Sequence, residues 1–199
     1  MVISPYSGLP EEDWLEKTIE LVSRHPLETD EIRAVVLGAW NDIFDSKLGP
    51  NNFQIGRHIF PKPQIMGFLL HELIPLEFGS RYPGTWKGET TAGDKDLVYI
   101  PDDLYSIEIK TSSHPSQVFG NRSYAQVGKG PAKKSKSGYY LTVNFGKFGT
   151  TDANPKILKI RFGWLDHSDW IGQAAASGQQ AHLSGGADRS KLLAIYPCE

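Results

Sequence analysis

The stretch that most constrains the fold is a pair of apolar segments joined by a short turn, Pro101-Asp102-Asp103. The segment before the turn covers residues 96–100, and the segment after it, residues 104–111, is rich in Ile, Tyr and Thr, which favour strands. A turn of this length can connect antiparallel strands, although it lacks the favoured Asn-Gly pair. We therefore predict a sheet that contains this hairpin.

Charged residues alternate with isoleucines in the second strand. Successive side chains of a strand point to opposite faces, so Ile107 and Ile109 are predicted to enter the core. Glu108 and Lys110 then project together from the other face, roughly 7 Å apart at a rise of about 3.3 Å per residue. The pattern predicts that a carboxylate and an ammonium group share one polar face.

The pairing of the two strands brings a second carboxylate to this face. If Ile100 faces Leu104, Asp96 lies opposite Glu108. A shift of one residue would expose the apolar side chains and separate the polar groups, so both patterns support one register. That register places these residues on the buried face: Leu97, Tyr99, Tyr105, Ile107 and Ile109.

Two carboxylates this close together predict a cation between them. Hard oxygen ligands suit Mg²⁺, and Mn²⁺ is expected to substitute for it. We expect Asp96 and Glu108 to hold the metal, with the backbone carbonyl of Ile109 as a further ligand and Asp94 as the alternative to Asp96. Lys110 would position the attacking water or neutralise charge on a phosphate. The predicted chemistry is metal-assisted hydrolysis of a phosphodiester.

These residues resemble the motif of the PD-(D/E)xK nuclease superfamily, with Asp96 followed after eleven residues by Glu108-Ile109-Lys110. Lys95 stands where the superfamily's name has proline. The continuation IEIKTSSHPSQVFGNRSY resembles the segment after the catalytic strand in blunt-cutting restriction enzymes of the EcoRV and HincII type. The general character of the chain resembles the ScaI family of restriction endonucleases, with a resemblance that is specific around the candidate site and architectural elsewhere. The resemblance implies a restriction-endonuclease-like core.

The resemblance also implies a type II restriction endonuclease that cuts double-stranded DNA at a short, palindromic site as a homodimer, with one active site per strand. A separate DNA methyltransferase would be its functional partner. In many members of the superfamily an acidic residue on a helix before the catalytic hairpin approaches the metal. Glu72 is the candidate here, with Glu77 second and a solvated surface glutamate as the alternative. We interpret His71 as a surface or packing residue because no second histidine has metal-site spacing.

The charge distribution is asymmetric although the net charge is only -2. Between Ile109 and Thr151 there is no Asp or Glu, and without the seven positive charges of that region the rest of the chain would carry -9. A basic band that starts at the candidate site is expected of a protein that binds a phosphate backbone. Its members are Lys110, Arg122, Lys129, Lys133, Lys134, Lys136 and Lys147.

Two polar segments are candidate DNA contacts. In the first, we expect Asn121, Arg122 and Ser123 to reach phosphates or bases and Lys129, Lys133, Lys134 and Lys136 to surround the duplex, with a flexible solvated linker as the alternative. The second, residues 177–190, is predicted to be a loop that reads bases, with a plain surface loop as the alternative. Its candidate residues are Gln180, His182 and Arg189.

The remaining pattern predicts one domain over residues 1–199, with a helical part at about 10–75 and a catalytic and DNA-binding core at about 80–199. Helices are predicted over residues 10–24, from residue 29 to just before Gly49, over 63–73 and over 168–176; Pro75 should end the third. A short strand is predicted within residues 80–92, and longer ones over 139–145, 157–164 and 192–196. The order predicts an α/β fold of the mixed α+β kind, with a mixed central β-sheet flanked by helices.

Composition adds two expectations. The single cysteine, Cys198, allows no internal disulfide, which favours a reducing, cytoplasmic setting. No apolar run is long enough to span a membrane. Two alternative functions stay open, namely another nuclease of the same superfamily (repair, resolvase or mobile-element) and a DNA-binding module without catalysis.

Overall fold

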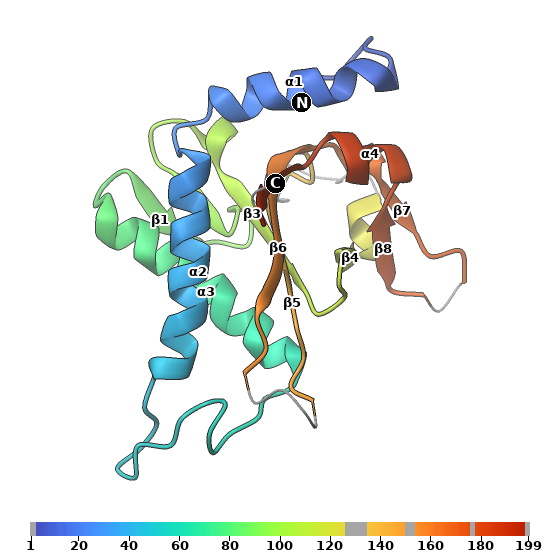
Figure 1. Cartoon of the computed structure of the whole chain (residues 1–199). Coiled ribbons are helices and arrows are strands. Elements are labelled where there is room, and N and C mark those ends of the chain that lie inside the picture. Colours follow the sequence, from blue (N-terminus) through green and yellow to red (C-terminus); the bar gives the residue numbers. More distant parts are fainter. Residues whose placement is uncertain (1–2, 126–134, 150–153, 176–177, 198–199) are drawn as a thin grey trace.

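A computed structural model describes residues 3–125, 135–149, 154–175 and 178–197, which are built around two β-sheets (Figure 1). The larger sheet has the strand order β1-β2-β3-β5-β6-β9. β3 and β5 pair in parallel, whereas the other four neighbouring pairs are antiparallel, so the sheet is mixed. Its strands are β1 (Trp86–Gly88), β2 (Leu97–Tyr99), β3 (Ile107–Ser112), β5 (Gly138–Phe145), β6 (Ile157–Leu165) and β9 (Leu193–Tyr196).

Long helices cover one face of this sheet (Figure 1). They are α1 (Trp14–Ser23), which follows the 3₁₀ turn η1 (Glu11–Asp13), α2 (Thr29–Asp45) and α3 (Pro63–Arg81). Buried aliphatic and aromatic side chains from α2, α3 and the sheet form one apolar cluster. The predicted mixed sheet flanked by helices is confirmed.

A smaller antiparallel sheet and a short helix cover the other face. The small sheet has the order β4-β8-β7, with β4 (Phe119–Asn121), β7 (Trp170–Gly172) and β8 (Gln180–Leu183). Around it lie the 3₁₀ turns η3 (Arg122–Ala125) and η4 (His167–Asp169) and the helix α4 (Gly185–Ser190). A second apolar cluster, which includes Val118, Trp170 and Leu183, joins this layer to the main sheet.

The helix predicted from residue 29 to just before Gly49 is confirmed as α2, which ends four residues before Gly49. Its apolar residues recur on helical spacing, and this stripe is buried except for the half-buried Phe44. The buried members are Ile32, Val35, Val36, Ala39, Trp40 and Ile43.

The buried face of α1 is partly polar, whereas Leu15 and Ile19 of the same helix are exposed. The buried side instead contains Thr18, whose hydroxyl lies 2.8 Å from the Tyr6 hydroxyl and donates to the Ser190 carbonyl at 2.7 Å. A threonine with all its hydrogen bonds made can be buried at little cost. Thr18 therefore lies on the buried face of α1, and Leu15 lies on the exposed face.

The prediction that Pro75 ends the third helix was wrong, because α3 continues to Arg81. An internal proline removes one backbone hydrogen bond and costs about 3 kcal/mol in an exposed helix. Here Ile74 and Phe78 on either side of Pro75 are fully buried, and this packing offsets the loss.

The predicted helix over residues 168–176 was also wrong. Asp166 and Asp169 form a capping box that closes the single turn η4, and Trp170 and Ile171 then enter β7. Within the predicted loop over residues 177–190, the structure has the strand β8 and the helix α4. The reason is visible in the sequence QAHL, in which Ala181 and Leu183 alternate with polar residues and are buried.

Among the described residues, none of the helices combines the length and the apolar character that crossing a membrane requires.

Candidate active site

Asp96 and Glu108 stand opposite each other in the register that the sequence predicted. Leu97 pairs with Ile107, so Asp96, just before β2, stands opposite Glu108 on β3. The Oδ2 atom of Asp96 accepts a hydrogen bond of 2.7 Å from the backbone N–H of Ile109, which fixes Asp96 beside β3. The turn is longer than predicted, because residues 103–105 form the 3₁₀ turn η2 and Leu104 is no strand residue. Asp102 caps that turn by accepting from the Leu104 N–H.

Glu108 lies on the face that was predicted to be polar, and it is almost completely buried there, at 1% exposed. The small sheet and η3 cover this face, and they supply a partner: the Tyr124 hydroxyl donates to Oε1 of Glu108. Lys110 Nζ donates to the same oxygen at 2.6 Å. The carboxylate is therefore held by two donors, one charged and one neutral.

Lys110 also donates to the Ile109 carbonyl, 3.1 Å from its Nζ. Its ammonium group thus contacts two of the oxygens predicted to bind a metal, one from Glu108 and one from the backbone. The predicted metal site requires oxygens that attract a cation. Carboxylate and carbonyl oxygens are of the hard type that Mg²⁺ prefers. The donor set fits such an ion.

Protein ligands alone would not complete a coordination shell. No group of three or more His, Cys, Asp or Glu side chains among the described residues is placed to hold a metal ion. Mg²⁺ ordinarily keeps several waters and binds through one or two carboxylates together with substrate phosphate oxygens. Asp96, Glu108 and the Ile109 carbonyl match that smaller ligand set.

Asp94, the alternative to Asp96, has a different role in its loop. Its Oδ2 accepts from the N–H groups of Thr90 and Thr91 and from the Thr90 hydroxyl, at 2.9 to 3.0 Å. These hydrogen bonds, led by that from the Thr90 backbone, lower the pKa of Asp94 to about 2. The side chain of Asp94 contacts the 90–91 turn, whereas that of Asp96 contacts β3 and His71.

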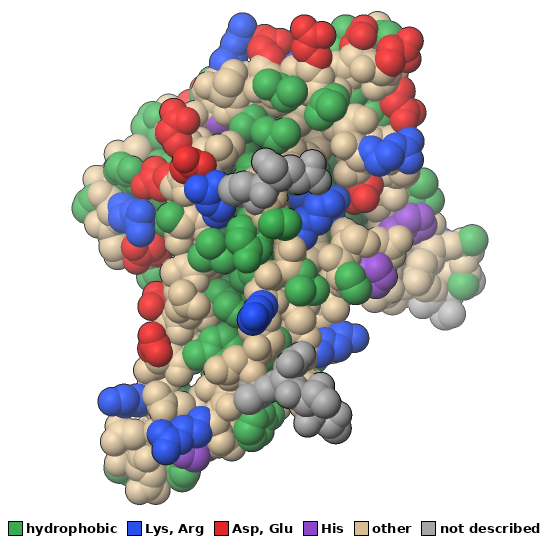
Figure 2. All heavy atoms as spheres, viewed as in Figure 1, with side chains coloured by type: hydrophobic (Ala, Val, Ile, Leu, Met, Phe, Trp, Pro, Cys, Tyr) green, Lys and Arg blue, Asp and Glu red, His purple; other side chains and the backbone are tan. Residues whose placement is uncertain are grey.

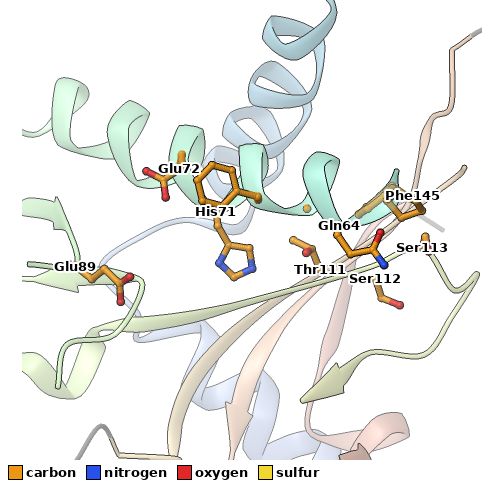
Figure 3. A pocket seen from close by; sticks show the side chains of 11 residues that line it. Gln64, His71, Glu72, Glu89, Thr111, Ser112, Ser113 and Phe145 are labelled. Atoms are coloured by element: carbon orange, nitrogen blue, oxygen red, sulfur yellow. The ribbon is translucent and has the colours of Figure 1, made fainter. Parts of the chain in front are cut away.

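Helix α3 forms the other wall of the site, and an open cleft of about 530 Å³ separates part of it from β3 (Figure 3). Gly67 allows the close approach, because a Cβ there would lie 2.5 Å from the Thr111 hydroxyl oxygen. One turn later, His71 Nδ1 lies 3.7 Å from Asp96 Oδ2. His71, interpreted from the sequence as a surface or packing residue, lines this cleft.

Glu72 lines the cleft beside His71, together with Glu89, which the sequence reasoning missed (Figure 3). A neighbouring cavity of about 200 Å³ brings both glutamates together with Asp96. The β1–β2 register pairs Gly88 with Leu97, and its continuation places Glu89 opposite Asp96. Only the sheet order could reveal this, because nothing in the local sequence marks β1 as a neighbour of β2. Glu77, the second candidate, lies outside this cleft and pairs with Arg81 at 2.8 Å.

The first segment of candidate DNA contacts is described only in part. Asn121 and Ser123 are exposed at β4 and η3, and Arg122 between them donates to the carbonyls of Ala175 (3.1 Å) and Gly178 (3.3 Å). Lys136 Nζ lies 4.1 Å from the centre of the Tyr124 ring. Lys129, Lys133 and Lys134 lie outside the described residues.

Gln180 and His182 are both exposed on β8, opposite Asn121 and Phe119 of β4. Arg189 lies apart from them on α4 and pairs with Glu11 at 3.1 Å. Figure 2 shows acidic side chains gathered at this α1 end of the molecule, which carries the acidic residues of η1. The structure therefore brings Asn121, Gln180 and His182 onto one sheet and leaves Arg189 beside acidic neighbours.

Comparison with known proteins identifies the family of this chain. The family model described as ScaI restriction endonuclease matches residues 4–196. A curated protein, the type II restriction enzyme ScaI of Streptomyces caespitosus, is 49% identical over 194 residues, which cover 97% of this chain and 85% of that protein. No solved structure matches the chain. The predicted class, a type II restriction endonuclease, is thus confirmed, and the chain belongs to the ScaI restriction endonuclease family.

Proposed function

We propose that this chain is a Mg²⁺-dependent endonuclease that hydrolyses both strands of duplex DNA at a short, palindromic site. The observation that carries the proposal is the meeting of Asp96, Glu108 and Lys110 at the β2–β3 pair, with Lys110 Nζ 2.6 Å from Glu108. Membership of a restriction endonuclease family supports it. The whole chain would act as one catalytic domain.

Each residue of the site has a defined task in this proposal. Asp96, Glu108 and the Ile109 carbonyl would hold Mg²⁺, or Mn²⁺ in its place, with Glu72 as a further acidic residue at the same cleft. When bound, the ion would supply an activated water and neutralise charge on the scissile phosphate. Lys110 would leave its contact with Glu108 to position the water or to stabilise charge that develops on the phosphate.

Asp96 has a second task, because its hydrogen bond to the Ile109 N–H holds β3 against the start of β2. This bond keeps Asp96 and the Ile109 carbonyl in a fixed relation. His71, 3.7 Å from Asp96, would add a polar contact on the α3 side of the cleft. Such preorganised partners reduce the reorganisation that the reaction requires.

For DNA contact, we propose the exposed face of the small sheet. Asn121 lies directly opposite Gln180. Gln173 lies just after β7 and donates its backbone N–H to the Gln180 carbonyl at 2.9 Å. Carboxamide side chains can pair bidentately with a base edge, above all adenine, in the major groove, and His182 extends this face. Arg122, Ser123, Lys136 and Lys147 would contact phosphates, and Lys129, Lys133 and Lys134 stay predicted contacts.

A homodimer is part of the proposal because a palindromic site has two-fold symmetry, and two copies would give one active site per strand. A DNA methyltransferase that protects host sites would be the functional partner, and both would act on DNA in the cytoplasm. Another nuclease of the superfamily, directed at a DNA structure, is the alternative.

The test is incubation of the purified protein with unmethylated plasmid or phage DNA in Mg²⁺, beside the variant Glu108→Gln. This variant keeps the size of the side chain and an oxygen for Tyr124 and Lys110, but removes the charge that holds a metal. Discrete fragments from the wild type and none from the variant are expected on a gel. Unspecific nicking would favour the structure-directed nuclease, and binding without cleavage would favour the DNA-binding module.

A further inference from the structure

Tyr124 is a buried aromatic residue of η3 that touches the candidate active site from the small-sheet side. It is 6% exposed. Its ring centre lies 5.3 Å from that of Trp170, and a Cβ at Gly120 would lie 3.2 Å from its ring. Packing on two sides therefore fixes where its hydroxyl can point.

The hydroxyl points at the carboxylate of Glu108 and donates a hydrogen bond to Oε1. A carboxylate oxygen can only accept, so the phenol is the donor of this bond and Glu108 the acceptor. Lys110 Nζ, which shares Oε1, also lies 4.8 Å from the centre of the Tyr124 ring.

The terminal torsion of a glutamate is broad, so the plane of its carboxylate is set by its partners. Two donors from different elements hold Glu108: Lys110 on the same strand and Tyr124 on η3. If Lys110 turns toward a phosphate during the reaction, as proposed above, Tyr124 is the donor that stays on Oε1.

We infer that Tyr124 is a positioning residue that orients the Glu108 carboxylate for metal binding, an inference that rests on the proposed function. Tyr124 would act through Glu108, without touching metal or DNA itself. Partners of this kind typically change metal affinity or activity by about 10- to 100-fold when they are removed.

The test is the variant Tyr124→Phe, which keeps the ring packed and removes only the hydroxyl. Binding of Mn²⁺ to the DNA-free protein, followed by electron paramagnetic resonance, is expected to weaken by about 10-fold or more. In cleavage assays the Mg²⁺ concentration for half-maximal rate should rise, and excess Mg²⁺ should restore part of the rate. DNA binding in Ca²⁺ at saturating concentration should be unchanged.

Tyr139→Phe is the matched control. Tyr139 is also buried on the main sheet, but it lies on the helix-covered face and its hydroxyl donates to the Leu21 carbonyl at 3.1 Å. This variant should bind Mn²⁺ like the wild type, and thermal unfolding will show that both variants are folded.

Equal Mn²⁺ affinity and equal Mg²⁺ dependence in Tyr124→Phe and the wild type would overturn the inference, as would the absence of Mn²⁺ binding by the wild type. Failure of the wild type to cut any DNA would instead overturn the proposed function. The Mn²⁺ comparison would still decide the role of Tyr124 in that case, because it needs no cleavage.

Discussion

The two faces of the six-stranded sheet are built from different kinds of residue. The face toward α2 and α3 consists of aliphatic and aromatic side chains, and these are buried without polar partners: Ile107, Ile109, Leu141, Val143, Ile160 and Phe162. The face toward the small sheet buries polar and charged side chains as well, namely Glu108, Thr142, Asn144 and Arg161. Both faces are buried, but only one of them is apolar.

The difference shows how each layer is held. On the helix-covered face, apolar area removed from water stabilises the contact without directionality. On the other face each buried charge has a specific partner: Arg161 donates to Asp188 at 2.7 Å and to the Ser116 carbonyl at 3.0 Å, and Glu108 accepts from Lys110. Buried ion pairs contribute little net stability compared with apolar packing. We therefore expect substitutions on the polar face to affect activity more than stability, and substitutions on the apolar face to affect stability more than activity.

The largest predicted effect tests this assignment on the polar face. Asp96→Asn keeps an oxygen that can accept the Ile109 N–H bond but removes the charge that would hold a metal. We expect cleavage of the recognition site to fall by about 10³-fold or more, with an unfolding temperature close to that of the wild type. Rates of plasmid cleavage in Mg²⁺ and thermal unfolding followed by circular dichroism provide the two measurements.

Leu141→Ala on the apolar face is the matched control. Leu141 is fully buried and pairs with Ile109 across β3 and β5. Truncation of a buried leucine costs about 2–5 kcal/mol of stability through lost burial and the cavity left behind. Well below its unfolding temperature this variant should cut DNA within a few fold of the wild-type rate. A large catalytic loss in folded Leu141→Ala would break the division between the two faces.

His25, from the segment between α1 and α2, packs against the apolar face, and its pKa is shifted. His25 lies 4.6 and 4.8 Å from the ring centres of Tyr139 and Phe162, accepts from the Leu27 N–H at Nδ1 and contacts the Tyr105 carbonyl through Nε2. Burial, as the main cause, lowers the pKa of His25 from 6.5 to about 4. The imidazole is therefore neutral in the folded protein.

This depressed pKa predicts a loss of stability in mild acid. Above pH 6.5 the folded and unfolded states both hold neutral histidine, so His25 makes no difference. Between pH 6.5 and about 4 the unfolded state binds the proton more readily, and stability falls by about 2 kcal/mol from pH 7 to pH 5. Urea unfolding of the wild type and of His25→Phe at both pH values measures this. An equal pH dependence in the two proteins would contradict the assignment.

The apolar face was also the one that the sequence predicted well. The alternation of apolar residues in β3, β5 and β6 and the apolar stripe of α2 are local periodic patterns, and these can be read directly from the sequence. The register that brings Asp96 opposite Glu108 followed from the same alternation. The burial of Glu108 did not, because it depends on Tyr124 and the small sheet, whose strands lie up to about sixty residues apart in sequence.

The same cause explains the other errors. The segments that form the small sheet, such as Phe119–Asn121 and Trp170–Gly172, are too short for periodicity to identify. Gln180–Leu183 is four residues long, and its alternation becomes meaningful only beside β4 and β7. Glu89 was missed because its approach to Asp96 depends on the pairing of β1 with β2.

The smallest predicted effect concerns the exposed outer surface of the small sheet, which covers the polar face of the main sheet. Gln180 is exposed and lies opposite Asn121. Gln180→Ala therefore removes a carboxamide and leaves the buried cluster beneath the small sheet unchanged. Loss of one bidentate base contact is worth about 1–3 kcal/mol of discrimination, so the ratio of cleavage rates at the recognition site and at sites with one changed base pair should fall by about 10-fold. Ile171→Ala, an exposed position on β7 opposite His182, is the control and should keep the ratio. If the ratio falls equally in both variants, the carboxamides are not the base-reading groups, because only general contact with the sheet surface would then matter.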